Sequence, residues 1–286
     1  MDNIYLNCKD YVIKGKICYS CGKQLCGHNN CKKKQICEIL ETLDHIPPKG
    51  LFEQNKGYPN IISNPERQKI TVPCCRECNN TYSKDEENFL IYITMIAAAK
   101  GNKIAEYALK DRYRTLDNNK KLGRNYVNNI KCKIDIATKS GIYIEPGVMF
   151  EISKNKEIES INKILKKMVK GFYYKYTGKK LNKEVLYFAD NAFYMKKGVN
   201  YHPKNPIPKE IKPLLDELDK GNRIIRSTKD LNRIATFYND NIDSDVFSYS
   251  FIRFQNKTTS SDDVLFVLKF YNNVKFILGT QPTEPF

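Results

Sequence analysis

Four cysteines in the first third of the chain have the type and spacing of a metal site. Cys18 and Cys21 form one CxxC pair, and Cys75 and Cys78 form a second pair much later in the sequence. Each pair offers two sulfurs from one tight turn, and two such pairs complete the closed tetrahedron of a structural zinc site. A redox-active CxxC requires a thioredoxin-like βαβ context, which the flanking sequence lacks. We therefore expect these four thiolates to bind structural Zn²⁺.

Three further residues, between the two CxxC pairs or directly after the second, are suited to hydrolysis of a phosphodiester bond. Asp44 and His45 lie between the two pairs, and Asn79 directly follows Cys78. A neutral imidazole is available near pH 7, so His45 is a candidate general base. The oxygens of Asp44 and Asn79 are hard ligands suited to Mg²⁺ or Mn²⁺. Because adjacent residues of a strand point to opposite faces, Asp44 and His45 require a twist or bulge to share one site.

The remaining cysteines leave two alternatives open. Cys74 is an alternative to Cys75 as a zinc ligand, and a second metal site is conceivable from Cys26, His28, Cys31 and Cys37. All but one of the ten cysteines precede residue 80, so they are expected to serve a local site. The exception, Cys132, is expected to be a small buried side chain.

The charge of the chain favours a polyanionic partner. The formal net charge is +16, and a net of +11 falls within residues 101–180, against +3 before and +2 after that segment. Such a basic block attracts nucleic acid by neutralising phosphates and releasing counterions. The alternative is a basic but solvated surface that reflects a genome rich in Lys, Asn and Ile codons.

Composition and length indicate a folded protein with one large domain or two modest ones. The chain has 286 residues, 41% of them hydrophobic, and contains no apolar run near the roughly 18–20 residues that span a bilayer. Its N-terminus has neither the basic start nor the apolar centre of a signal peptide. We expect a cytoplasmic protein without a membrane segment.

Periodicity and turn signals predict the α+β class. Ser83 and Glu86 form a capping box before an apolar helix that extends to about residue 99, and helical spacing resumes at residues 104–109. Residues 126–152 are typical of a strand pair. An amphipathic helix follows, with its apolar stripe at Ile161, Ile164, Leu165, Met168, Val169 and Phe172 and with lysines 163, 166, 167 and 170 at the other positions.

The C-terminal third predicts a small antiparallel sheet. A proline-rich loop at about 200–213 precedes alternating apolar runs, and Asn272-Asn273 is a plausible turn between the last two. We expect a zinc-containing domain at residues 1–100 and a basic α+β accessory domain at residues 101–286 that ends in this sheet.

The sequence resembles the HNH endonucleases, which are ββα-metal nucleases stabilised by a zinc site. Three stretches carry the resemblance: the Cys18 and Cys21 pair, Asp-His-Ile-Pro-Pro-Lys at residues 44–49, and Cys-Arg-Glu-Cys-Asn-Asn at residues 75–80, followed by Ser-Lys-Asp-Glu-Glu at residues 83–87. The match covers roughly residues 15–90 and points to a stand-alone bacterial subgroup.

The resemblance implies a role for each motif residue. His45 would be the general base, Asp44 and Asn79 would hold the catalytic Mg²⁺ or Mn²⁺, and the four cysteines would hold structural Zn²⁺. The middle asparagine of the family pattern is absent. Gln68 stands near its place, and Asn60 or Asn64 are alternatives. Nearby cations that could contact phosphates are Lys49, Arg76 and Lys84.

The resulting hypothesis is a metal-dependent endonuclease that cuts double-stranded DNA, in defence against phage or plasmid DNA. Because a ββα-metal unit cuts one strand per site, a homodimer or two successive nicks would be needed for a double-strand break. The sequence has no GxxxxGK[ST] motif, so any ATPase or sensor would be a separate partner. The alternatives are a zinc-stabilised nucleic-acid-binding module without cleavage and an RNA-directed nuclease or toxin.

Overall fold

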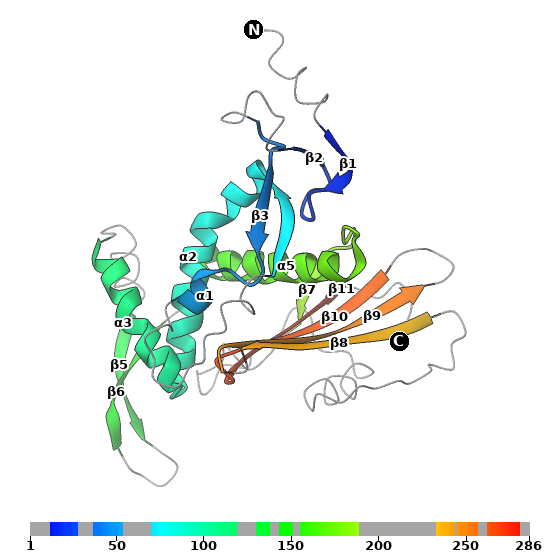
Figure 1. Cartoon of the computed structure of the whole chain (residues 1–286). Coiled ribbons are helices and arrows are strands. Elements are labelled where there is room, and N and C mark those ends of the chain that lie inside the picture. The colour runs from blue at the N-terminus through cyan, green and yellow to red at the C-terminus, as the bar shows by residue number, and fades with distance from the viewer. Residues whose placement is uncertain are drawn as a thin grey trace.

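The chain combines helices with antiparallel sheets, which confirms the α+β class (Figure 1). The computed structural model describes residues 12–27, 37–53, 70–118, 130–137, 143–150, 155–188, 233–243, 245–256 and 262–280. The proline-rich loop expected at 200–213 lies outside these ranges. Among the described helices, none is both long and apolar enough to span a bilayer.

The N-terminal part is built from two strand pairs and a long helix. The strands are β1 (Val12–Ile17), β2 (Gln24–Cys26), β3 (Glu41–His45) and β4 (Thr71–Cys75). β1 pairs with β2, and β3 pairs with β4, both antiparallel. The short helix α1 (Gly50–Glu53) follows β3, and α2 (Arg76–Ala99) follows β4 without a loop. The order β3, β4, α2 therefore forms a ββα unit.

Helix α2 begins earlier than the sequence predicts. Cys75 is its N-cap, and the Cys75 thiol accepts a hydrogen bond from the backbone N–H of Cys78 at 3.4 Å. Ser83 and Glu86, the predicted capping box, lie inside the helix instead. The Cys75 thiol satisfies the backbone donor of Cys78, so a cysteine takes the capping role usually filled by Ser, Thr or Asp.

The described residues after α2 form two helices, a strand pair and a five-stranded sheet. The helices are α3 (Lys103–Asn118) and α5 (Asn155–Thr177), and the strand pair is β5 (Ile130–Ala137) with β6 (Tyr143–Phe150). The sheet is antiparallel in the order β7-β11-β10-β9-β8. Its strands are β7 (Val185–Phe188), β8 (Arg233–Asp243), β9 (Phe247–Asn256), β10 (Asp262–Phe270) and β11 (Val274–Thr280).

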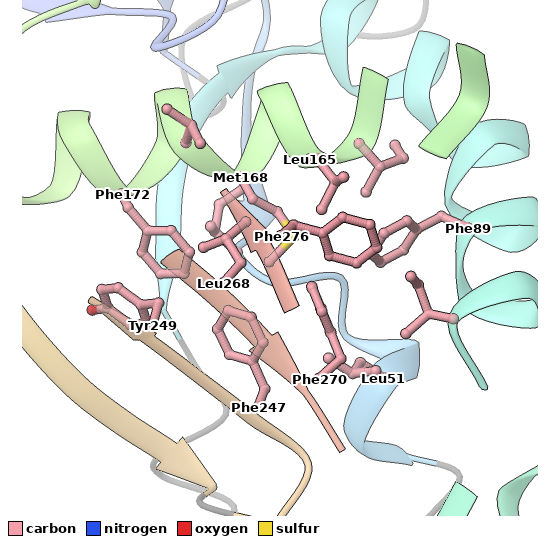
Figure 2. Close-up of a cluster of buried hydrophobic side chains, with 14 of the residues drawn as sticks. Leu51, Phe89, Leu165, Met168, Phe172, Phe247, Tyr249, Leu268, Phe270 and Phe276 are labelled. Atoms are coloured by element: carbon pink, nitrogen blue, oxygen red, sulfur yellow. The ribbon is translucent and has the colours of Figure 1, made fainter. Parts of the chain in front are cut away.

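One hydrophobic core joins the cysteine-rich N-terminal part to the C-terminal sheet. Figure 2 shows α5 above the sheet strands, with apolar side chains of α2, α5 and the sheet between them. Phe172 of α5 stacks on Tyr249 of β9 at 3.9 Å between ring centroids, and Phe89 of α2 meets Phe270 of β10 edge-on at 5.5 Å. The expected boundary at residue 100 falls between α2 and α3, but packing in the described residues is continuous across it.

The apolar stripe predicted on α5 is confirmed, and one lysine departs from its predicted face. All six stripe residues are fully buried. Lys163 is exposed and Lys166 and Lys170 are half-buried, whereas Lys167 is also fully buried. Lys167 lies at the edge of the stripe, one turn after Ile164, and faces the N-terminal part of the chain.

A glycine allows α5 to pack closely against the end of β3. A Cβ atom at Gly171 would lie 2.6 Å from Cγ1 and 2.8 Å from Cδ1 of Ile46, the residue after His45. Ile46 is itself almost fully buried, so it has little room to move. The absence of a side chain at Gly171 thus sets how near the helix comes to the predicted catalytic histidine.

We predict that Gly171→Ala destabilises the protein although alanine favours helices. The helix gains about 1 kcal/mol from the substitution, whereas forced overpacking costs about 1–3 kcal/mol. We expect a net loss near 1 kcal/mol in the free energy of unfolding, measured by urea denaturation. Because Ile46→Ala removes the clashing atoms, the double variant should lose less than the sum of the single variants. Additive losses would show that Ile46 does not limit this packing.

Candidate functional site

The four predicted ligand cysteines come together in the structure. The sulfur atoms of Cys18, Cys21, Cys75 and Cys78 all lie within 4.8 Å of one another, and those of Cys21 and Cys75 are 3.8 Å apart. A tetrahedral site with Zn–S bonds of about 2.3 Å has sulfur–sulfur edges of about 3.8 Å. The donor set and its geometry therefore fit a metal ion such as zinc.

Tight turns present the sulfurs of each pair. In the first turn, the N–H of Cys18 donates to the carbonyl of Lys23 and the N–H of Gly22 donates to the carbonyl of Cys18, both at 2.9 Å. Gly22 has a φ of 81°, a left-handed conformation that favours glycine. The second turn is the start of α2. Lys180 connects the first turn to the segment after α5, since its ammonium donates to the carbonyl of Cys21 at 3.1 Å.

Cys74 lies beside the cluster without belonging to it. Its sulfur is 3.9 Å from that of Cys18, and this hydrogen bond between the two sulfurs lowers the pKa of Cys18 to about 4. The same contact and burial raise the pKa of Cys74. The raised pKa keeps Cys74 a neutral thiol, which is a poor metal ligand.

The second metal site left open by the sequence receives no support from the described residues. Cys26 and Cys37 pack in a small buried cluster with Leu40, while His28 and Cys31 lie outside the described ranges. Within the described part of the chain, the only group of three or more metal-binding side chains is the cluster of Cys18, Cys21, Cys75 and Cys78.

Asp44 is buried and both of its carboxylate oxygens accept hydrogen bonds. The Tyr19 hydroxyl donates to Oδ2 at 2.6 Å, and the Lys167 ammonium donates to Oδ1 at 2.7 Å. Only 4% of Asp44 is exposed. The expected divalent cation does not fit this arrangement, because an ammonium already lies against the oxygen that would bind it. The predicted role of Asp44 as a ligand of the catalytic cation therefore receives no support from the described residues.

The contacts of Asp44 belong to a buried polar network. Lys167 of α5 also donates to Glu86 of α2, and its ammonium lies 4.9 Å from the centre of the Tyr82 ring. Burial and the charge of Asp44 raise the pKa of Tyr19. Burial also raises the pKa of Glu86, and the Lys167 charge opposes that shift. This network thus connects four segments through side-chain contacts: the first CxxC turn, β3, α2 and α5.

His45 lies on the opposite face of β3 from Asp44. The β3–β4 register runs without a shift from Glu41 opposite Cys75 to His45 opposite Thr71. Since no register shift breaks the alternation, Asp44 faces the interior while His45 shares its face with Leu43, which is 60% exposed. The structure therefore does not direct the two side chains into one shared site.

Asn79 lies near the start of α2, half-buried, on the same side of the helix as Glu86 and two turns before it. The α2 side chain that meets Asp44 through Lys167 is that of Glu86, on this same side of the helix. The pairing of Asp44 with Asn79 as cation ligands stays a prediction. Gln68, Asn60 and Asn64 lie outside the described residues.

The three predicted phosphate-contacting cations are dispersed. Lys49 and Lys84 are exposed, and Arg76 is half-buried at the first position of α2. The backbone N–H of Arg76 donates to the carbonyl of Leu40, at the end of the β3–β4 pair opposite to His45. With about 3.4 Å per strand residue, this places Arg76 more than about 10 Å from His45 along the hairpin.

Sequence reasoning missed three residues of this site. Tyr19 is inside the first CxxC pair, and Glu86 is inside the motif at residues 83–87, but neither had a predicted role. Lys167 was grouped with Lys163, Lys166 and Lys170 at the positions off the apolar stripe of α5. The available signal was its position at the edge of the apolar stripe, where a lysine requires a buried partner.

Comparison with known proteins gives no match to this chain among protein families, curated proteins or solved structures. The geometry of the described residues is therefore the basis for any functional proposal. That geometry consists of a four-cysteine cluster, a ββα unit and a buried ion-pair network around Asp44.

The geometry of the cysteine cluster predicts different outcomes for two adjacent cysteines. Cys75→Ser should remove bound zinc and lower the free energy of unfolding by several kcal/mol, because metal-binding energy in such sites is folding energy. Cys74→Ser is the matched control and should retain one equivalent of zinc. Zinc content by mass spectrometry of the purified variants and urea denaturation provide the two readouts. If Cys75→Ser retains zinc and Cys74→Ser loses it, Cys74 is the zinc ligand and Cys75 is not.

Proposed function

We propose that the chain is an HNH-type endonuclease that hydrolyses phosphodiester bonds in DNA. The observation that supports this most is the order of elements around the second CxxC pair. β3 ends in His45 and pairs antiparallel with β4, and β4 leads directly through Cys75 and Cys78 into α2. This is the ββα order expected of that nuclease class, with zinc holding the start of the helix against the first CxxC turn.

His45 is the proposed general base. It lies at the end of β3 and is half-buried, which leaves the imidazole within reach of solvent, unlike the buried Asp44 beside it. A neutral imidazole accepts a proton from water near pH 7. The resemblance further implies Mg²⁺ or Mn²⁺ in the reaction. The ammonium of Lys167 already contacts Asp44, so the requirement for Mg²⁺ or Mn²⁺ rests on the resemblance alone. The cleavage assay therefore includes both cations.

Double-stranded DNA is the proposed substrate. The net charge of +16 provides sequence-independent attraction to phosphates, and the exposed Lys49 and Lys84 lie in the ββα part of the chain. The proposed setting is cytoplasmic defence against phage or plasmid DNA, with a homodimer or a separate ATPase or sensor as partner. RNA is the alternative substrate, since ββα-metal sites cut both nucleic acids.

A second candidate function is a zinc-stabilised nucleic-acid-binding module that does not cut. One observation favours it specifically: both oxygens of Asp44 accept hydrogen bonds from Tyr19 and Lys167. In this function, Asp44 serves the fold and His45 is a surface residue. The two candidates therefore differ in whether the imidazole of His45 is needed.

Plasmid nicking by zinc-loaded protein distinguishes the two functions. With Mg²⁺ or Mn²⁺ added, we expect conversion of supercoiled DNA to open circles. His45→Ala should lower the rate by about 100-fold or more, the contribution typical of a general base. His202→Ala changes a histidine of the proline-rich segment expected at about 200–213, far from the predicted motifs in sequence, and should cut at the wild-type rate.

Electrophoretic mobility shifts of the same variants provide the contrasting outcome. If wild type and His45→Ala bind DNA equally and neither cuts DNA or RNA with either cation, the binding module is the correct function. If both cut DNA equally, the general base is a residue other than His45.

A further inference from the structure

Three lysines beside the cysteine cluster place their positive charges close together. Lys166 and Lys170 lie one turn apart on α5, and Lys180 follows the end of that helix. Burial and the neighbouring charges of Lys180 and Lys166 lower the pKa of Lys170, which shows that the three ammonium groups repel one another. Such a group of like charges is stabilised when an anion binds to it. We call these three residues the lysine surface.

The lysine surface has little negative charge around it. Elsewhere near the cysteine cluster, a lysine has its own carboxylate, as Lys23 does in its contact with Glu77 at 2.6 Å. Among the described residues, the only carboxylate that pairs with the lysine surface is Glu184, 3.6 Å from Lys166. The Glu184 side chain is 77% exposed, so solvent screens this pair. Three ammonium groups thus share one weakly held carboxylate.

Lys170 has the least compensation of the three. Its residue is half-buried, and its ammonium has no hydrogen-bond or ion-pair partner among the described residues. A partly desolvated ammonium has lost some of its contact with water without gaining an acceptor. An anion that binds there gains more electrostatic energy than it would at a fully solvated lysine.

Lys180 is held in place by the first CxxC turn. Its ammonium donates to the carbonyl of Cys21 at 3.1 Å, which leaves two of its N–H groups for another acceptor. Its stem crosses Gly22 so closely that a Cβ atom at Gly22 would lie 2.9 Å from Cδ of Lys180. Because the side chain is already ordered, binding an anion costs it less conformational entropy.

The lysine surface adjoins the ββα unit. Lys170 precedes Gly171, which packs against Ile46 at the end of β3. Lys180 contacts the turn that presents two sulfurs of the cysteine cluster. Double-stranded DNA carries one negative charge per about 1.7 Å of helix axis, so several phosphates can meet a group of closely spaced lysines.

We propose that Lys166, Lys170 and Lys180 form a binding surface for the phosphate backbone of double-stranded DNA. The inference rests on the proposed function for the choice of DNA, and it adds a contact surface outside the predicted motifs. Lysine–phosphate contacts release counterions and read no bases. The surface therefore positions DNA beside the ββα unit without selecting a sequence.

The contrary interpretation is that the three ammonium groups only offset the charge of the cysteine cluster. Four thiolates leave two negative charges uncompensated by one Zn²⁺. The charge of Cys78 also acts on Lys170, and it raises the pKa that the neighbouring lysines lower. In that case, removal of the lysines would weaken zinc binding and leave DNA binding unchanged. Zinc content is therefore measured together with DNA binding.

The test measures the salt dependence of DNA binding by zinc-loaded protein without added Mg²⁺ or Mn²⁺. Fluorescence anisotropy of a short labelled duplex gives the dissociation constant at several KCl concentrations, and an RNA duplex of the same sequence is measured in parallel. The double variant is Lys166→Gln with Lys170→Gln, which keeps the contact of Lys180 with the CxxC turn. The triple variant adds Lys180→Gln.

Two controls accompany these variants. One removes the same charge as the triple variant at the other end of α2 and in the nearby strand β11, by Lys100→Gln, Lys103→Gln and Lys275→Gln. The other keeps the charge of the lysine surface, by Lys166→Arg with Lys170→Arg.

Loss of the lysine surface should make DNA binding less sensitive to salt. The slope of log K against log [KCl] should become shallower by about 0.9 for each lysine removed, because each phosphate contact contributes that amount. At low salt, the triple variant should bind DNA about tenfold or more weakly than wild type. The control at the other end of α2 should change the slope by less than half as much, and the arginine variant should keep the wild-type slope.

Four results would overturn the proposal. They are an unchanged DNA slope in both test variants, an equal change in the control at the other end of α2, loss of zinc from both test variants, and a change for RNA without one for DNA. Because no readout involves cleavage, a chain that shows the expected change and cuts no nucleic acid retains this inference while the proposed function fails. A chain that cuts DNA and shows no change retains the proposed function and loses this inference.

Discussion

The arrangement of this protein depends on one buried ion pair, between Asp44 of β3 and Lys167 of α5. Glu86 of α2 and Tyr19 of the first CxxC turn complete its contacts, so four segments far apart in sequence meet at two charged groups. Loss of one partner from such a pair costs about 3–5 kcal/mol, a large share of the about 5–15 kcal/mol that stabilises a typical domain. The position of α5 is therefore constrained by charge as well as by its apolar stripe.

The four-cysteine cluster is a second constraint on the fold, and it lies next to the buried ion pair of Asp44 and Lys167. Tyr19 lies between the ligands Cys18 and Cys21, so the turn that presents two sulfurs also presents the hydroxyl that contacts Asp44. Cys75 and Cys78 begin α2, the helix that carries Tyr82 and Glu86 toward Lys167. A metal bound to the cysteines thereby fixes both the hairpin and the helix around the buried network. Structure at the metal cluster and electrostatics at Asp44 are not independent features.

Asp44 and His45 point to opposite faces of β3 and therefore lie in different surroundings. An unbroken strand directs the carboxylate inward, where it stabilises the packing of α5, and directs the imidazole to the side that includes exposed Leu43. In the proposed function, a phosphate group would meet the half-buried imidazole, while the carboxylate stays paired with an ammonium. Because Gly171 packs against Ile46, α5 lies next to the end of β3 that carries Asp44 and His45.

The sequence by itself determined the α+β class, the four cysteines of the cluster, the apolar stripe of α5 and the antiparallel C-terminal sheet, because each depends on local spacing or periodicity. It also determined that Asp44 and His45 needed an irregular strand to act together. Only the tertiary structure decided that the strand is regular, that α2 begins at the cysteine turn, and that Lys167 is buried against Asp44. The physical reason is distance along the chain: 123 residues separate Asp44 from Lys167, and no local pattern specifies a contact formed by packing one helix across another.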